Sequence, residues 1–423
     1  MDVQTVSDLG PDDRSAIFDR DAGVDAIRDD VRVVVDRVRE EGDVALREFT
    51  AEYDGVDVGA IEITDEAEQA AATVEAEVHE AIDTAARNVR TFHERQVRSD
   101  WTEDFDGREL GRRFRPLERV GVYVPGGSAA YPSSALMGVI PAVVAGVDQV
   151  VVTTPPAEEI NPVTLAAIHI AGADEVYQVG GSQAIAAMAY GTESIPAVQK
   201  IVGPGNRWVT AAKAEVQGDV AIDFLAGPSE VLVVADDTAD PAFVAAELLA
   251  QAEHDENAAV VAVTDEESVA TAIAEAVEDQ LPERDRRETI DAALENDASG
   301  VFLARSMSEA ILFADEFAAE HLSVQVADPE TVLDRIDAAG SIFVGPHTPV
   351  AAGDYASGTN HVLPTNGLAK RHGGLSVDEF VRSTTIQRLD RGALESLGDA
   401  IVTLADAEGL EAHAESVRRL LDR

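Results

Sequence analysis

Side chains suited to proton transfer occur at two places in the second half of the sequence. Glu320 and His321 are adjacent, at the predicted junction of a helix and a strand. A carboxylate beside an imidazole can supply two acid–base groups to one site, although a histidine at a helix end can also be structural. Asp354 and His361 lie in a loop whose glycines permit the turns that would direct both side chains at a ligand. These four residues are the first candidates for catalysis.

Three further side chains could bind a cation. Gln251 and His254 lie three residues apart at the end of a predicted helix, so they share one face of it. A metal ion could bind both, but a histidine at a helix end more commonly compensates the helix dipole. His413 lies on the last predicted helix among apolar residues at helical spacing, where a buried structural histidine is the alternative. Because the sequence has no cysteine, thiolate-bound metals, disulfides and a cysteine nucleophile are excluded.

Glycine-rich turns follow or precede several predicted strands. They are PGG at 125–127, GGSQ at 180–183, GPGN at 203–206 and GPS at 227–229. The backbone N–H groups of such turns can bind phosphate. None of them continues as GxGxxG with an acid about 20 residues later, which is the usual dinucleotide pattern. The residues by themselves leave both a nucleotide site and simple tight turns open.

Alternating strands and helices must position these residues. Residues 11–100 are predicted to be mostly helical. After them, helices of about 10–15 residues separate short apolar strands, which predicts parallel sheets with ligands at the carboxyl ends of the strands. The first series of strands covers 120–124, 148–154, 175–179 and 200–202, and the second covers 230–235, 258–264, 300–303, 322–326 and 341–344.

The predicted fold is therefore of the α/β class, with two Rossmann-like parallel-sheet units and helical extensions at both ends. We expect a helical N-terminal region at 1–115, α/β units at 116–228 and 229–385, and a C-terminal helical extension at 386–423. A long loop at 345–376 is typical of a functional segment, and the last part of the chain is predicted to form two helices separated by Gly409.

The composition indicates adaptation to high salt. Lysine and arginine together total 32 against 80 acidic residues, which gives a formal net charge of −48. The acids are spread among apolar segments, and lysine occurs only at 200, 213 and 370, a pattern suited to molar salt that screens charge. Such a surface repels phosphate backbones, so we expect no binding to nucleic acid or anionic membranes. The first residues lack the apolar core of a signal peptide, and no run of about 18 apolar residues occurs, which predicts a cytoplasmic protein.

In its motifs the chain resembles the histidinol dehydrogenase family. The similarity extends over nearly the whole chain and is densest between residues 121 and 413. Each motif by itself is weak, but all of them in order and at compatible spacing are specific. The motifs are GVYVPGG (121–127), YPSS (131–134), GPGN (203–206), AGPSE (226–230), QAEH (251–254), EH (320–321), GDYASGTNHVLPT (353–365) and EGLEAH (408–413).

The resemblance implies oxidation of L-histidinol to L-histidine through L-histidinaldehyde, with two NAD reduced and one zinc ion per subunit. It implies an aldehyde-dehydrogenase-like fold, with NAD on the 116–228 unit, zinc and catalysis on the 229–385 unit, and a homodimer that exchanges 386–423. By position, the resemblance implies the zinc ligands Gln251, His254, Asp354 and His413, and the catalytic pair Glu320 and His321. The implied NAD contacts are Tyr123, Gln183 and Asn206. The implied substrate contacts are Ser229, Glu408 and His321, together with the zinc ligands.

The chemistry of the two oxidations agrees with these roles. Alcohol oxidation needs a base for the hydroxyl proton while hydride moves to the nicotinamide, and an imidazole with a pKa of about 6.5 suits that task, which favours His321. Aldehyde oxidation cannot use a cysteine here, so water must attack, and Glu320 is the candidate that activates it. The implied zinc would mainly hold the imidazole and amino nitrogens of the substrate.

Other functions remain as alternatives. A dehydrogenase of another amino alcohol would use the same groups, and a zinc hydrolase on the same scaffold would act without NAD. A non-catalytic binding protein would normally have lost one of the key side chains, and Glu320, His321, Asp354 and His413 are all present. The chain is also shorter than many relatives between residues 213 and 222, which predicts a trimmed surface helix.

Overall fold

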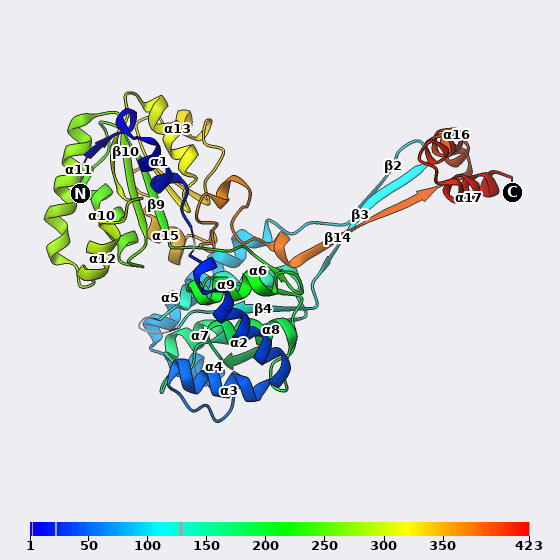
Figure 1. Ribbon diagram of the computed structural model, residues 1–423, viewed down its shortest axis with the longest axis horizontal. Coiled ribbons are helices and arrows are strands. Elements are labelled where there is room, and N and C mark those ends of the chain that lie inside the picture. Colours follow the sequence, from blue (N-terminus) through cyan, green and yellow to red (C-terminus); the bar gives the residue numbers. More distant parts are fainter. Residues whose placement is uncertain (2, 22, 127–129, 423) are drawn as a thin grey trace. The chain divides into compact units, whose positions relative to one another are not determined.

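The computed structural model describes residues 1, 3–21, 23–126 and 130–422, so Gly127 of the predicted PGG turn lies outside the described residues. The chain divides into two compact units, and Figure 1 labels many of their elements. The first unit comprises Met1–Gln96 and Glu118–Phe380, and the second comprises Val97–Leu117 and Val381–Arg423. Glu408 and His413 therefore belong to the second unit, and every other candidate site residue belongs to the first.

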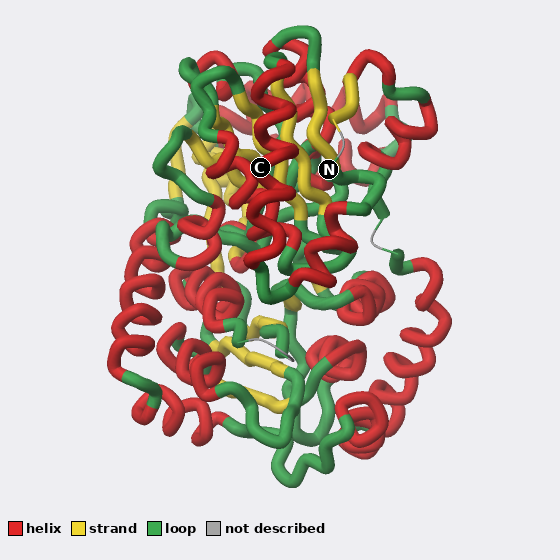
Figure 2. The backbone as a smooth tube through the Cα atoms, turned by 90° about the vertical axis from the view of Figure 1, so that its left-hand side faces the viewer, coloured by secondary structure: helices red, strands yellow, loops and turns green. Residues whose placement is uncertain are grey.

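A five-stranded parallel sheet in the first unit confirms the first predicted series of strands. Its order is β6 (Glu175–Gln178), β5 (Gln149–Thr154), β4 (Arg119–Tyr123), β7 (Lys200–Val202) and β8 (Ala221–Ile222). The helices that follow its strands are α6 (Pro132–Ala145), α7 (Pro162–Ala171), α8 (Gly181–Tyr190) and α9 (Arg207–Val216). Figure 2 shows helices on both sides of this sheet. The central strands β4, β5 and β7 are almost entirely buried, as expected for a parallel sheet whose two faces are both covered.

The predicted N-terminal helices pack on the helices of this sheet. They are α2 (Arg28–Glu41), α3 (Asp43–Phe49), α4 (Thr64–Thr73) and α5 (Ala76–Glu94). Helix α2 packs on α8 and α9, α4 packs on α7, and α5 packs on α6. The apolar residues of α2, Val31, Val34, Val35 and Val38, recur at helical spacing and are all buried, so the amphipathic pattern explains how this helix covers the sheet layer.

A six-stranded parallel sheet, also in the first unit, confirms the second predicted series. Its order is β1 (Val3–Thr5), β11 (Gly300–Leu303), β10 (Ala259–Thr264), β9 (Glu230–Ala235), β12 (His321–Gln325) and β13 (Ser341–Val344). Its helices are α1 (Pro11–Phe18), α10 (Pro241–Ala252), α11 (Glu267–Gln280), α12 (Arg287–Leu294), α13 (Met307–Phe317), α14 (Pro329–Leu333) and α15 (Val350–Tyr355). The first unit also contains short 3-10 or π-helical segments, namely η1 (Val6–Asp8), η2 (Asp25–Ile27), η3 (Thr50–Asp54), η4 (Leu281–Glu283), η5 (Leu368–Lys370) and η6 (Val377–Phe380).

The second unit contains an antiparallel sheet and two helices. The strands are β14 (Val381–Leu389), β3 (Arg108–Pro116) and β2 (Trp101–Asp104), in that order. Helices α16 (Arg391–Ala407) and α17 (Glu411–Leu421) are the two predicted C-terminal helices. They pack against each other. Leu404, Leu410 and Leu420 on this helix pair are 64%, 43% and 51% exposed. In the part of the chain that the structure describes, no helix is long and apolar enough to cross a membrane.

Candidate active site

A cleft of about 1840 Å³ in the first unit collects the predicted site residues of that unit. On the side of the five-stranded sheet, its walls include the end of β4 and the turns after β5, β7 and β8, as predicted for carboxyl ends. On the side of the six-stranded sheet, the walls are formed at the amino ends of the strands, with Ser229 before β9 and Glu320 before β12, so the predicted position at the carboxyl ends is wrong there. The predicted residues that line it are Tyr123, Gln183, Asn206, Ser229, Gln251, His254, Glu320, His321, Asp354 and His361. Glu408 and His413 lie on the helix pair of the second unit and are exposed there.

The acid–base pair lies where α13 turns into β12. Ala318 ends α13 in the left-handed conformation, with φ of 53°, and reverses the chain into the strand. Glu320 then precedes the strand and His321 is its first residue, paired in register with Val231 of β9. Both side chains are buried. Pairing with β9 therefore fixes the position of both residues in the wall of the cleft.

Hydrogen bonds set the orientation of both groups. The Nδ1–H of His321 donates to the backbone carbonyl of Glu230 at 3.0 Å, because a carbonyl oxygen can only accept. The backbone N–H of Glu230 donates to Oε2 of Glu320 at 2.9 Å. Nε2 of His321 is buried 3.3 Å from Oδ1 of Asp354, without the geometry of a hydrogen bond to any described residue. In its neutral form the ring therefore directs an unsatisfied lone pair at a carboxylate, so a proton or a cation is needed between them.

The environment raises the pKa values of both groups above those of the free side chains. Burial raises the pKa of Glu320 to about 7. Burial lowers the pKa of His321, but the negative charge of Glu320 and the contact with Asp354 outweigh it and raise the pKa to about 9. Two neighbouring groups with displaced pKa values are typical of an acid–base site.

Three side chains of the first unit offer the donor types that zinc accepts without thiolate. Gln251 lies at the end of α10, and the N–H of His254 donates to its backbone carbonyl at 3.2 Å. Burial lowers the pKa of His254, which keeps the ring in the neutral, metal-binding form. Asp354 comes from α15, whose first N–H, on Val350, donates to the buried carboxylate of Glu247 at 2.8 Å. The amide, the imidazole and the carboxylate line the same cleft.

The fit to a metal is incomplete within the first unit. Among the described residues, no group of three or more His, Cys, Asp and Glu side chains is close enough to hold a metal ion. The predicted set has only His254 and Asp354 of these types in the first unit, since Gln251 is an amide and His413 belongs to the second unit. Burial opposes ionisation of Asp354, but the contact with His321 and the charges of His361 and His254 lower its pKa. The Asp354 carboxylate therefore supplies a charged oxygen donor in the same cleft as the neutral His254 imidazole and the Gln251 amide, and these donor types fit zinc.

The predicted NAD contacts lie on the side of the cleft formed by the five-stranded sheet. The hydroxyl of Tyr123 accepts a hydrogen bond of 3.2 Å from the N–H of Gly181, at the start of α8. Asn206 caps α9, and its Oδ1 accepts from the N–H groups of Trp208 and Val209 at 3.0 and 3.2 Å. The N-terminal ends of both helices line the cleft, and helix N-termini favour phosphate groups. Gln183, on the first turn of α8, completes this group.

A buried ion pair that the sequence did not predict holds the 203–206 turn. Nζ of Lys213 donates to Oδ1 of Asp223 at 2.7 Å and to the carbonyl of Gly203 at 2.6 Å. Gly203 has φ of 111°, and a Cβ there would lie 2.2 Å from the carbonyl oxygen of Tyr123, so only glycine fits. The scarcity of lysine could have indicated that a lysine inside an apolar helix has a specific partner. Asp54, also in the cleft and not predicted, has its pKa raised to about 6 by burial.

Comparisons with known proteins agree on one family. The histidinol dehydrogenase family profile matches residues 19–420. The histidinol dehydrogenase of Haloarcula marismortui is 69% identical over 419 residues, which is 99% of each chain, and this halophilic source agrees with the predicted salt adaptation. The crystal structure of histidinol dehydrogenase from Elizabethkingia anophelis matches with a TM-score of 0.94 and 38% identity, over 100% of this chain and 97% of that one.

The predicted aldehyde-dehydrogenase-like fold is also confirmed. An acetylating aldehyde dehydrogenase from Geobacillus thermoglucosidasius matches with a TM-score of 0.50, over 90% of this chain and 97% of that one. At 14% identity this likeness concerns the fold alone.

Proposed function

The chain belongs to the histidinol dehydrogenase family of oxidoreductases, and we propose that it converts L-histidinol to L-histidine through L-histidinaldehyde, reducing two NAD. The observation that carries this proposal is the shared cleft. A buried acid–base pair, an amide–imidazole–carboxylate set and the N-terminal ends of two helices line it together. These are the groups needed to move protons, to hold an imidazole-bearing substrate and to bind a dinucleotide.

In the first oxidation, Nε2 of His321 accepts the proton of the substrate hydroxyl. The hydrogen bond from Nδ1–H to the Glu230 carbonyl keeps the lone pair on Nε2, on the side of Asp354. As the O–H bond breaks, the C–O bond becomes a carbonyl and the carbinol C–H leaves as hydride to the nicotinamide of NAD. The products are L-histidinaldehyde, NADH and a protonated His321.

In the second oxidation, Glu320 activates water. The carboxylate accepts a proton from water as the oxygen attacks the aldehyde carbon, and a second hydride leaves for a second NAD. The carboxylic acid formed in this way loses its remaining proton to solvent, so the product is a carboxylate. A pKa raised to about 7 by burial makes Glu320 a stronger base than an exposed glutamate. Its hydrogen bond from the Glu230 N–H fixes one oxygen and leaves the other available.

Zinc fits the remaining donors. Bound zinc would hold the substrate imidazole and amino group and so position the carbinol carbon. Gln251, His254 and Asp354 would hold the ion from the first unit, and His413 from the second. Ser229 and Glu408 are proposed to contact the substrate beside it.

We infer that the protein is a homodimer in which α16 and α17 of one subunit complete the site of the other. The exposed leucines of this helix pair support the inference, because a small two-helix unit that leaves such side chains uncovered is suited to an interface. Exposure of Glu408 and His413 supports it as well, since both side chains are accessible to a second subunit.

Substrate discrimination separates this proposal from its alternatives. With NAD and zinc in molar KCl, the purified protein should form NADH from L-histidinol and at least about 100-fold less from an amino alcohol without an imidazole ring. Equal rates with both alcohols would favour a dehydrogenase of wider specificity. Hydrolysis of an ester or amide substrate in the absence of NAD, without NADH formation from L-histidinol, would favour a zinc hydrolase.

The pH dependence should follow the charge of His321. The ring must be neutral to accept the hydroxyl proton; burial lowers its pKa, but the neighbouring carboxylates raise it to about 9. The value of kcat/KM for L-histidinol should therefore rise with pH, by about tenfold per unit well below this pKa, and level off above it. A profile between pH 6 and 10 under constant salt checks this, and a rate that falls from pH 7 to 9 would contradict the role of His321.

A further inference from the structure

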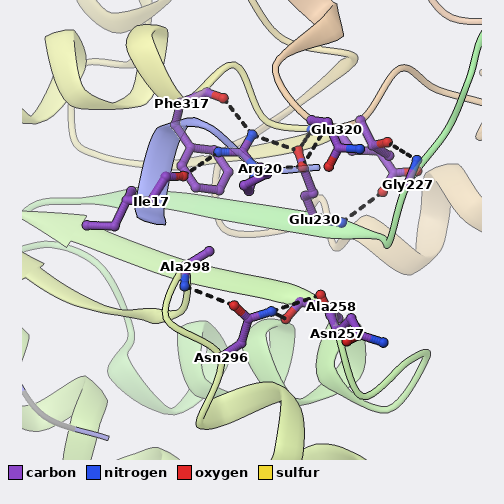
Figure 3. A network of polar contacts seen from close by, with 12 residues as sticks. Ile17, Arg20, Gly227, Glu230, Asn257, Ala258, Asn296, Ala298, Phe317 and Glu320 are labelled. Carbon is purple, nitrogen blue, oxygen red and sulfur yellow. Dashed lines mark hydrogen bonds and ion pairs between the residues drawn. The ribbon is translucent and has the colours of Figure 1, made fainter. Parts of the chain in front are cut away.

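A buried arginine from the N-terminal segment reaches the catalytic pair through one glutamate. The side chain of Arg20, just after α1, is 7% exposed and that of Glu230 is 1% exposed. Nε of Arg20 donates to Oε1 of Glu230 at 2.7 Å, and Nη2 donates to Oε2 at 3.2 Å. This two-point contact fixes the carboxylate plane as well as its position (Figure 3).

The guanidinium group of Arg20 also contacts two backbone carbonyls and an aromatic ring. Nη1 donates to the carbonyl of Ile17 at 2.7 Å, and Nη2 donates to the carbonyl of Phe317 at 2.8 Å. The group also stacks 3.7 Å from the centre of the Phe317 ring. Arg20 thus ties the end of α1 to the end of α13, three residues before Glu320.

Glu230 contacts Glu320 through its backbone and its side chain, and it contacts His321 through its backbone. Its N–H donates to the Glu320 carboxylate, and the N–H of Glu320 donates back to Oε2 of Glu230 at 3.3 Å. Its carbonyl accepts from His321 and thereby selects the tautomer. Oε1 also accepts from the N–H of Asn366 at 2.8 Å, which anchors the loop that follows Thr365.

From this network we infer that Arg20 and Glu230 are positioning residues of the catalytic pair, with the buried ion pair holding the Glu230 backbone that orients Glu320 and His321. The inference rests on the proposed function, since it takes its roles for Glu320 and His321 from there. Without Arg20, the buried Glu230 carboxylate would have no cationic partner near the Glu320 carboxylate, and the two like charges would repel each other. The strand end would shift or rotate to separate them, and both catalytic side chains would move with it.

The test compares Arg20→Met with Arg14→Met. Arg14 lies on the same segment and pairs with Glu316 of α13, but both side chains are exposed, at 40% and 47%. Arg20→Met should slow histidinol oxidation about tenfold and histidinaldehyde oxidation about 100-fold, because Glu320 serves only the second step. Arg14→Met should leave both rates within about twofold of the wild type. A mere loss of folded protein would lower both rates by the same factor, so equal losses in Arg20→Met would overturn the inference.

A second readout needs no substrate. In protein labelled with ¹⁵N at its nine histidines and studied at a pH high enough to keep the His321 ring neutral, the His321 signal, assigned by its absence in His321→Asn, should report the Nδ1–H tautomer in the wild type. A mixture of tautomers is expected in Arg20→Met and in Arg20→Lys, which keeps the charge but loses the two-point contact. An unchanged tautomer in a folded Arg20→Lys protein would overturn the inference. A wild type that shows this tautomer but does not oxidise L-histidinol would instead refute the proposed function.

Discussion

Glu320→Gln is expected to slow the oxidation of L-histidinaldehyde by about 100- to 10,000-fold and that of L-histidinol by less than about tenfold, because general-base catalysis contributes on this scale. The amide oxygen can still accept the hydrogen bond from the Glu230 N–H, so the side chain should keep its place. What it loses is the ability to accept a proton from water. His321, with its own hydrogen bond to the Glu230 carbonyl, remains available for the first oxidation.

Separate assays with L-histidinol and with L-histidinaldehyde measure the two effects, and accumulation of the aldehyde during histidinol turnover is a further sign. Glu316→Gln makes the same chemical change on an exposed residue at the end of α13, and both its rates should match the wild type. Equal losses in both half-reactions of Glu320→Gln would show that Glu320 has no separate role in the second step.

The proposed exchange between subunits predicts recovery of activity from two inactive variants. His413→Asn and His321→Asn should each lose at least about 100-fold of the activity as homodimers, since one lacks a zinc ligand and the other the base. Co-expressed in equal amounts, they should yield about a quarter of the wild-type activity. Random pairing makes half of the dimers mixed, and each mixed dimer has one site with an intact His321 and an intact His413 from the partner.

Differently tagged subunits allow the mixed dimers to be purified, and these should show about half of the wild-type activity per dimer. If His413 acted on its own subunit, every site in the mixture would lack one essential residue. Activity no higher than that of the parent homodimers would then contradict the exchange, while leaving the roles of the two histidines in place.

The buried part of the fold could be predicted because its sequence signal is strong. Strands such as β5 and β9 are apolar runs between helices, and a parallel sheet covered on both faces requires this. β14 and β3 carry a different pattern. They are polar strands, with β3 mostly half-buried and β14 largely exposed, and they pair with each other although they lie far apart along the chain, so no local periodicity marks them. β1, with three residues, is too short to show a period at all.

In the candidate site, too, some residues could be predicted from the sequence and others could not. His254, Asp354 and the Glu320–His321 pair could be selected because their types and spacing suggest chemistry, and the structure brings them to one cleft. Arg20 could not be selected, because its partner lies 210 positions away and an arginine after a short helix resembles any surface arginine. Supporting contacts of this kind depend on tertiary packing, and only the structure reveals them.

NADH formation from L-histidinol in molar KCl, before and after dialysis against a chelator, tests the central claim most directly. The account predicts two NADH per histidinol consumed, L-histidine as the product, loss of activity on chelation and recovery on addition of zinc. One NADH per histidinol, with the aldehyde as the final product, would contradict the proposed second oxidation. No NADH from folded, zinc-loaded protein would contradict the proposed reaction as a whole.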